Sequence, residues 1–211
     1  MSSVVTVHGL WMRSTAMGVL RRRLEPNGFS FHDFTYSSIA GSLSANVDAL
    51  EAFVARVPGE TVHFVGHSLG GVLICALLER SLPARTGRVV CLGSPLKGSK
   101  TAARLCRWPG GRHLIGKCLV DVHARGGFAA WRAGVEVGCI AGRMPFGVGR
   151  LLGPFPEPND GTVAVEETVI AGHTDHIVLP VSHVALLWST NVAKQVAHFL
   201  ERGRFLHETA A

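Results

Sequence analysis

The feature that most constrains this chain is a serine between two glycines, at the junction of two apolar segments. Residues 61–65 are Thr-Val-His-Phe-Val, which predicts a short buried strand, and residues 69–82 are largely apolar, which predicts a buried helix. Between them lies Gly-His-Ser-Leu-Gly at residues 66–70. Glycine has no Cβ, so two backbones can approach closely at a sharp turn. The pattern therefore predicts a strand-to-helix turn that presents the hydroxyl of Ser68 at the start of a helix.

Apolar runs alternate with helical patterns along the whole chain. This alternation predicts a single α/β domain over residues 1–211, in which a mostly parallel sheet of about six strands carries helices on both faces. The expected strands are residues 3–7, 29–36, 61–65, 88–92, 135–141 and 176–179, and the expected helices are residues 15–24, 43–57, 69–82 and 184–202. Residues 94–133 and 144–160 are rich in glycine and fit no simple element.

Composition excludes two classes of protein. Hydrophobic residues make up 47% of the 211 residues and charged residues 17%. A disordered chain is excluded, because such chains are poor in apolar residues and rich in charge. The longest apolar stretch, residues 64–78, is shorter than the roughly 20 residues of a membrane-spanning helix. No basic segment precedes the first apolar run, so a secretory signal is not expected.

Cysteine usage and net charge bear on compartment and partners. The five cysteines are an odd number without Cys-x-x-Cys spacing, which predicts free thiols in a reducing, cytoplasmic compartment. The formal net charge of +6 either serves to keep the protein in solution or favours transient contact with an anionic membrane surface. Few aromatic residues accompany the basic residues of 94–133, so nucleic acid is not expected as a partner. The sequence leaves the oligomeric state open.

The serine motif resembles that of a known family. Gly-His-Ser-Leu-Gly-Gly at residues 66–71 is similar to the nucleophile elbow of α/β-hydrolases, in the form that lipases and esterases carry. Residues 8–10, His-Gly-Leu, and residues 92–95, Leu-Gly-Ser-Pro, extend the resemblance. It implies an α/β-hydrolase fold and a serine esterase or lipase. It also implies that the backbone N–H groups of Leu10 and Leu69 stabilise the oxyanion. We expect no cofactor, and no metal because residues 173–176, His-Thr-Asp-His, have no second ligand set beside them.

A serine hydroxyl becomes a nucleophile only when a base takes its proton, and the family order places that histidine last in the chain. The sequence contains eleven histidines, so position must identify the base. His183 follows the last expected strand and precedes the last expected helix, which places it on a loop at the carboxyl edge of the sheet. His198 lies inside the expected helix and His207 near the end of the chain. We therefore expect His183 to be the base for Ser68.

Two aspartates compete for the role of the acid that orients this histidine. Residues 159–163, Asn-Asp-Gly-Thr-Val, resemble the segment that carries the acid in related lipases, and this favours Asp160. Asp175 is closer in sequence to His183 but is expected at the start of a strand. The Asp160 segment also has the simpler interpretation of an ordinary Asp-Gly turn.

The expected reaction is cleavage of a small-molecule or lipid ester through an acyl-enzyme formed on Ser68. The apolar residues Trp11 and Met12 beside the oxyanion segment are candidates for the acyl pocket, or else ordinary core. Residues 94–133 are either a lid or cap insertion that covers the acyl chain or a solvated connection without substrate contact. An acyltransferase, a thioesterase and a non-catalytic binding module of the same fold remain alternatives.

Overall fold

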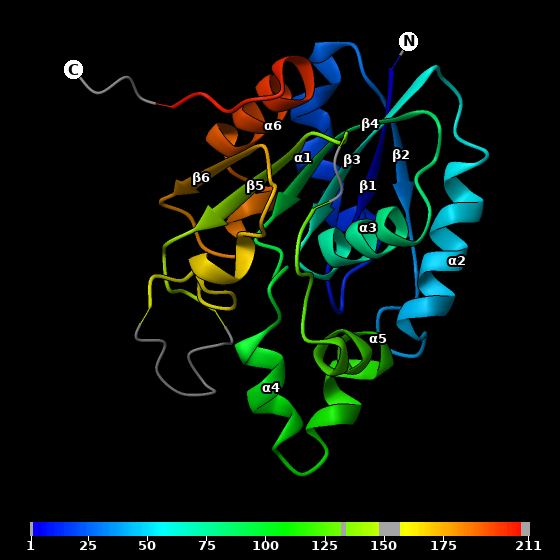
Figure 1. Ribbon diagram of the computed structural model, residues 1–211. Coiled ribbons are helices and arrows are strands. Elements are labelled where there is room, and N and C mark those ends of the chain that lie inside the picture. The colour runs from blue at the N-terminus through cyan, green and yellow to red at the C-terminus, as the bar shows by residue number, and fades with distance from the viewer. Residues whose placement is uncertain (1, 132–133, 148–156, 208–211) are drawn as a thin grey trace.

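The computed structural model describes residues 2–131, 134–147 and 157–207. Within them six strands form one sheet in the order β2-β1-β3-β4-β5-β6, and every neighbouring pair is parallel. The strands are β1 (Ser2–Val7), β2 (Ser30–Phe34), β3 (Thr61–His67), β4 (Thr86–Leu92), β5 (Val137–Gly142) and β6 (Asp175–Leu179). Figure 1 shows them as one twisted sheet. The expected α/β class with a parallel sheet of six strands is confirmed.

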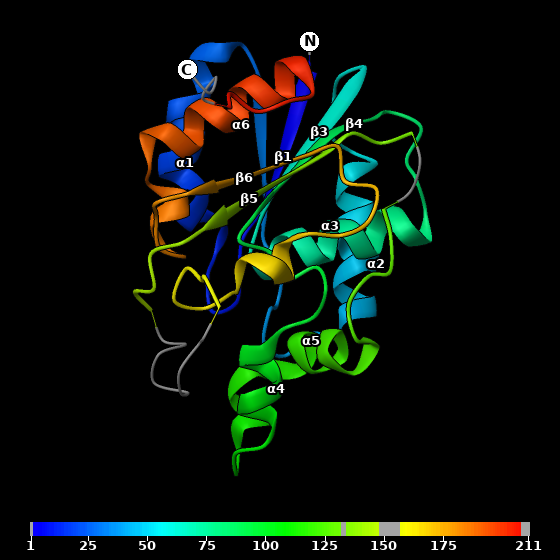
Figure 2. The same ribbon diagram turned by 60° about the vertical axis from the view of Figure 1, so that its left-hand side comes forward.

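Helices cover both faces of the sheet, because successive residues of a strand point to opposite faces. Val89 of β4 belongs to one hydrophobic cluster and its neighbour Val90 to another, and Phe64 and Val65 of β3 divide in the same way. The covering helices are α1 (Gly18–Leu24), α2 (Leu43–Val54), α3 (Leu69–Arg80) and α6 (Thr190–Arg202). Figure 2 shows α1 and α6 on one side of the sheet and α2 and α3 on the other.

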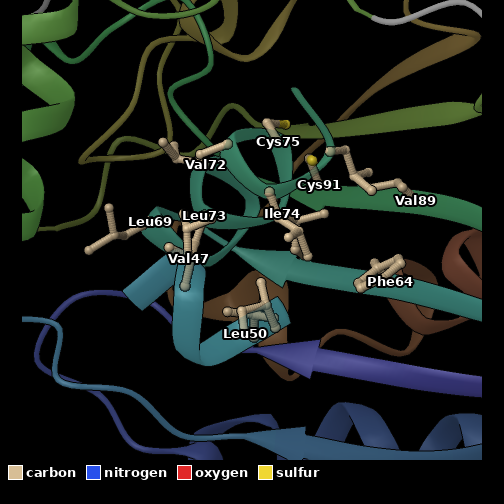
Figure 3. Close-up of a cluster of buried hydrophobic side chains, with 14 of the residues drawn as sticks. Val47, Leu50, Phe64, Leu69, Val72, Leu73, Ile74, Cys75, Val89 and Cys91 are labelled. Atoms are coloured by element: carbon tan, nitrogen blue, oxygen red, sulfur yellow. The ribbon is translucent and has the colours of Figure 1, made fainter. Parts of the chain in front are cut away.

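The larger cluster surrounds α3, in which every residue from Leu69 to Leu78 is buried. Figure 3 shows Leu73 of this helix together with Val47 and Leu50 of α2. The helix is apolar on all sides because the sheet, α2 and the region around Phe128 each bury one of its faces. This packing holds the start of α3, and therefore the residue before it, in one position.

The expectation that residues 94–133 fit no simple element is wrong. They contain α4 (Lys100–Cys106) and α5 (Gly111–Arg125), and Figures 1 and 2 show both at the end of the molecule away from α6. Gly116 interrupts α5 with φ 74°, and a Cβ at this position would lie 2.5 Å from Cα of Ile39. Gly116, one of the glycines that made this segment look irregular, therefore permits a kink and a close backbone contact.

The last helix is shorter than expected. It begins at Thr190 instead of Val184, because the side chain of Ser189 accepts a hydrogen bond from the N–H of Val192 and caps the helix there. Residues 183–189 consequently form a loop with a short 3₁₀ turn. Part of the second segment without a simple element, residues 148–156, lies outside the described residues. No helix in the described ranges is long and apolar enough to cross a membrane.

Candidate active site

Ser68 occupies a strained turn between β3 and α3. Its φ is 54° and its ψ −120°, and in the described part of the chain it and Trp11 are the residues other than glycine with positive φ. The flanking glycines make the turn possible: a Cβ on Gly66 would lie 2.5 Å from the nitrogen of Gly71, and one on Gly70 would lie 2.1 Å from the carbonyl oxygen of Val7. The turn places Ser68 at the positive end of α3.

Two backbone segments border Ser68. Leu69 is the first residue of α3, so its N–H has no acceptor within the helix. Residues 8–10 follow β1, and a Cβ on Gly9 would lie 3.2 Å from Cβ of Ser68. The structure therefore places Leu10 and Leu69 on segments that both adjoin the serine.

An aromatic contact supports residues 8–10, the segment after β1. The ring of His8 stacks on that of Tyr36, with 4.5 Å between the ring centres, and the Tyr36 hydroxyl donates to the His8 carbonyl oxygen at 2.9 Å. Burial lowers the pKa of His8 below its ordinary value. His8 therefore supports the backbone here as a neutral side chain.

Asp160 and His183 form a buried hydrogen-bonded pair. His183 Nδ1–H donates to Oδ2 of Asp160 at 2.7 Å, and the two residues are 7% and 1% exposed. The other oxygen, Oδ1, accepts the backbone N–H groups of Thr162 at 2.9 Å and Val163 at 2.7 Å. These bonds leave one carboxylate oxygen directed at the imidazole and fix the His183 tautomer with its proton on Nδ1.

The rival residues lie elsewhere. Asp175 begins β6, at the opposite edge of the sheet, and accepts hydrogen bonds from the N–H of Phe205 at 2.7 Å and from His207 at 2.9 Å. His198 contacts the carbonyl oxygen of Arg204, and His176 contacts the Thr168 hydroxyl. The structure thus brings Asp160, and not Asp175, to His183.

The end of β4 links the serine to this pair. The N–H of Ser68 donates to the carbonyl oxygen of Leu92 at 2.8 Å. The next residue, Gly93, has φ 54°, and a Cβ there would lie 3.0 Å from Asp160 Oδ2 and 3.1 Å from His183 Nδ1. Ser68 therefore adjoins Leu92, and the acid–histidine pair adjoins the next residue, Gly93, at the carboxyl edge of the sheet.

Sequence reasoning missed one residue of this centre, His67. Its side chain is completely buried, its ring centre lies 4.7 Å from that of His183, and its Nε2–H donates to the His183 carbonyl oxygen at 3.0 Å. Burial, and secondarily the proximity of His183, lowers the pKa of His67 to about 3. A titratable side chain inside an apolar strand, directly before the serine, was the signal available in the sequence.

An open groove of about 580 Å³ lies directly after residues 8–10 in the chain and is lined by residues 11–13 and 35–39. Trp11 borders it and is 52% exposed, although its backbone N–H donates to Ser38 Oγ at 3.3 Å and its indole N–H to the Leu114 carbonyl oxygen at 3.0 Å. Met12 also lines the groove and packs partly against the hydrophobic cluster beneath α1. The groove therefore has one rigid aromatic wall.

Residues 94–133 are tied to the segment that carries Asp160. The carboxylate of Glu167 accepts the N–H groups of Lys100 and Ala164, each at 2.6 Å, and its backbone oxygen accepts the N–H of Lys97 at 3.0 Å. The hydroxyl of Thr101 donates to the Thr162 carbonyl oxygen at 2.5 Å. Burial raises the pKa of Glu167 above its ordinary value. The start of α4 and the acid loop therefore form one connected unit.

A metal centre has no support in the described ranges: there, no three His, Cys, Asp or Glu side chains gather in an arrangement that holds a metal ion.

Comparison with known proteins identifies the architecture. Residues 30–113 match the family model described as alpha/beta hydrolase. The mature form of the Bacillus licheniformis lipase BlEst2 superposes with a TM-score of 0.76 at 17% identity, over 95% of this chain and 91% of that one. A metagenomic carboxyl esterase superposes with a TM-score of 0.70 at 21% identity, over 94% of this chain and 75% of that one. No curated protein sequence matches the chain. At such identities the likeness shows the fold.

Proposed function

Because this chain has the α/β-hydrolase fold, we propose that it is a serine hydrolase that cleaves carboxylic esters through an acyl-enzyme. The observation that carries the proposal is the buried Asp160–His183 hydrogen bond beside the strained turn at Ser68. A positive φ at a residue other than glycine costs about 1–3 kcal/mol, and such strain occurs mostly at functional sites. A non-catalytic binding module has no need of that strain or of a carboxylate that fixes a histidine tautomer.

In the proposed reaction the Ser68 hydroxyl oxygen attacks the ester carbonyl carbon. His183 carries its proton on Nδ1, held by Asp160, so Nε2 is the nitrogen that accepts the serine proton. The carbonyl oxygen becomes an oxyanion and receives hydrogen bonds from the N–H groups of Leu10 and Leu69. Preorganised donors of this kind each contribute about 3 kcal/mol to the stability of a transition state.

Collapse of the tetrahedral intermediate breaks the bond to the alcohol oxygen, which leaves with the proton from His183. A water molecule then attacks the acyl group on Ser68, and His183 takes one of its protons. The second intermediate releases the carboxylic acid and returns the proton to Ser68. Each acyl transfer is therefore served by the same base, and the sum is hydrolysis of one ester bond.

We assign the groove beside the oxyanion segment to the acyl part of the substrate. Its lining includes Trp11, the residue that follows Leu10 in the chain, and its volume of about 580 Å³ falls within the usual range of small-molecule sites. Trp11 and Met12 supply apolar wall to it. The two structural neighbours described above are a lipase and a carboxyl esterase, which supports a small-molecule or lipid ester as substrate.

Residues 94–133 are proposed as the cap over this region. The indole N–H of Trp11 donates a hydrogen bond to the Leu114 carbonyl oxygen in α5, so the acyl groove and the cap share this side chain as a wall. Arg107, Arg112 and Lys117 are exposed on this segment and favour transient contact with an anionic membrane surface, an attraction that salt screens.

The test is turnover of p-nitrophenyl esters of increasing acyl length, run beside a thioester. We expect ester hydrolysis by the wild type and none by Ser68→Ala or His183→Ala, whereas Ser44→Ala, at an exposed position of α2, keeps full activity. His176→Ala and His198→Ala are expected to keep most of it. Mass spectrometry after reaction with an organophosphonate locates the modified residue. Modification at another residue, or undiminished turnover by Ser68→Ala, contradicts the proposal.

A further inference from the structure

The side chain of His67 makes a single hydrogen bond within the described part of the chain, and this bond reaches the residue proposed as the base. Its Nε2 lies 3.0 Å from the carbonyl oxygen of His183. A carbonyl oxygen only accepts hydrogen bonds, so Nε2 carries the proton and Nδ1 is the bare nitrogen. Since burial lowers the pKa of His67 to about 3, this neutral tautomer persists at physiological pH.

The other ring nitrogen of His67, Nδ1, indicates that packing alone does not explain a histidine at this position. Nδ1 is buried and has no hydrogen-bond partner in the described residues. It faces Gly9, where a Cβ would lie only 3.0 Å away. A buried acceptor without a partner is costly, and an apolar side chain of similar size would avoid that cost. The bond from Nε2 is the one benefit that an apolar side chain cannot provide.

That bond differs in origin from the other hydrogen bonds of His183. The backbone N–H of His183 donates to the carbonyl oxygen of Asp160 at 2.8 Å, and its Nδ1–H donates to the Asp160 carboxylate at 2.7 Å. Both of these hold His183 to the acid loop. The bond from His67 comes instead from β3, whose next residue is Ser68. It therefore joins the loop of the base to the strand of the nucleophile.

We propose that His67 is a positioning residue that holds His183 at the distance from Ser68 needed for proton transfer, through the hydrogen bond to the His183 backbone. The inference rests on the proposed function. It assigns His67 no contact with substrate and no proton transfer. Because residues 67 and 68 are adjacent in the chain, a bond from one sets the separation of the base from the other. Misplacement of reacting groups by about 1 Å lowers rates by about 100-fold.

Three substitutions separate the hydrogen bond from the shape of the side chain. His67→Gln places an amide N–H near the position of Nε2 and retains a donor. His67→Met has a similar length and no donor, and His67→Asn has a donor too short to reach the His183 carbonyl oxygen. We expect His67→Gln to keep kcat within about 3-fold, and His67→Met and His67→Asn to lose about 10- to 100-fold in kcat with KM nearly unchanged. His67→Asn serves where His67→Met fails to fold.

A second measurement is independent of turnover. Proton NMR of the wild type detects the His183 Nδ1–H as a low-field resonance, as expected for a buried imidazole bonded to a carboxylate. This resonance stays sharp in His67→Gln and broadens in His67→Met and His67→Asn, if the bond from His67 keeps the loop in place. Full kcat in a folded His67→Met or His67→Asn overturns the proposal, as does an equal loss in all three variants. Failure of the proposed function has a different signature: turnover that persists in Ser68→Ala.

Discussion

Asp160 and His183 are joined twice, once through the backbone and once through their side chains. The His183 N–H donates to the Asp160 carbonyl oxygen at 2.8 Å, and the imidazole donates to the carboxylate at 2.7 Å. The first bond aligns the two loops, and the second sets the ring tautomer. An Asp-Gly turn alone explains neither contact, because both reach 23 residues along the chain.

Replacing the carboxylate by an amide separates the two candidate acids. Asp160→Asn removes the acceptor that keeps the proton on Nδ1 of His183, and such a replacement lowers turnover by roughly ten-thousandfold. Asp175→Asn, at the other edge of the sheet, is expected to change kcat by less than about 3-fold. Ester turnover by folded variants checks both values. The opposite ranking would assign the acid role to Asp175.

Two equally exposed tryptophans test which surface holds the acyl chain. Trp11 and Trp108 are each 52% exposed, but of the two only Trp11 lines the groove formed by residues 11–13 and 35–39. We expect Trp11→Ala to lower kcat/KM for octanoate esters by about 10-fold or more, because each buried CH₂ of the acyl chain contributes about 0.8 kcal/mol. The kcat/KM for acetate esters should be nearly unchanged. Trp108→Ala tests instead whether residues 94–133, the proposed cap, contact the acyl chain. If only Trp108→Ala alters the acyl-length preference, the chain binds under α4 and α5 and not in the groove.

Acid is expected to destabilise the fold through His67. A histidine in the unfolded chain titrates near pH 6.5, whereas burial lowers the pKa of His67 to about 3 in the folded protein. Between these values the unfolded chain binds a proton that the folded chain does not, so stability falls as the pH falls below 6.5. From pH 7 to pH 5 this effect lowers the free energy of unfolding by about 2 kcal/mol. Urea unfolding at pH 7 and pH 5 measures this decrease in the free energy of unfolding. The decrease should be about 2 kcal/mol smaller for His67→Gln than for the wild type. Identical losses would show that His67 protonates freely in the folded state.

Neighbouring glutamates differ in how they hold residues 94–133. Glu167 is buried and accepts two backbone N–H groups, one of them from Lys100 of α4, whereas Glu166 makes an exposed ion pair with the same lysine. Glu167→Ala leaves buried donors unpaired and is expected to lower the free energy of unfolding by about 1–3 kcal/mol or more. Glu166→Ala should cost less than about 1 kcal/mol. Urea unfolding and the rate of proteolysis within 94–133 measure both effects. Equal behaviour of the two variants would mean that the acid loop does not anchor α4.

Local patterns in the sequence were sufficient for the sheet, for the turn at Ser68 and for most helices, because hydrophobic periodicity and a glycine-flanked serine are properties of neighbouring residues. They failed for α4 and α5, whose glycines and basic side chains hide the periodicity. Gly116 is an example: it looks like a helix breaker, and its reason is a contact with Ile39, far away in the sequence. The last helix was placed six residues too early, because a cap at Ser189 competed with an apolar run that continues through residues 184–187.

The sequence by itself determined the class of fold and a serine at the junction of β3 and α3, since both follow from the order of apolar, polar and glycine residues along short segments. Only the tertiary structure decided which aspartate contacts His183. It also decided that the exposed Trp11 is held by two hydrogen bonds at the wall of the groove, and that His67 connects the strand of Ser68 to the loop of His183. These relationships join residues 23 to 116 positions apart. They depend on which strands are neighbours in the sheet and on where each loop leaves its carboxyl edge, and no local pattern carries that information.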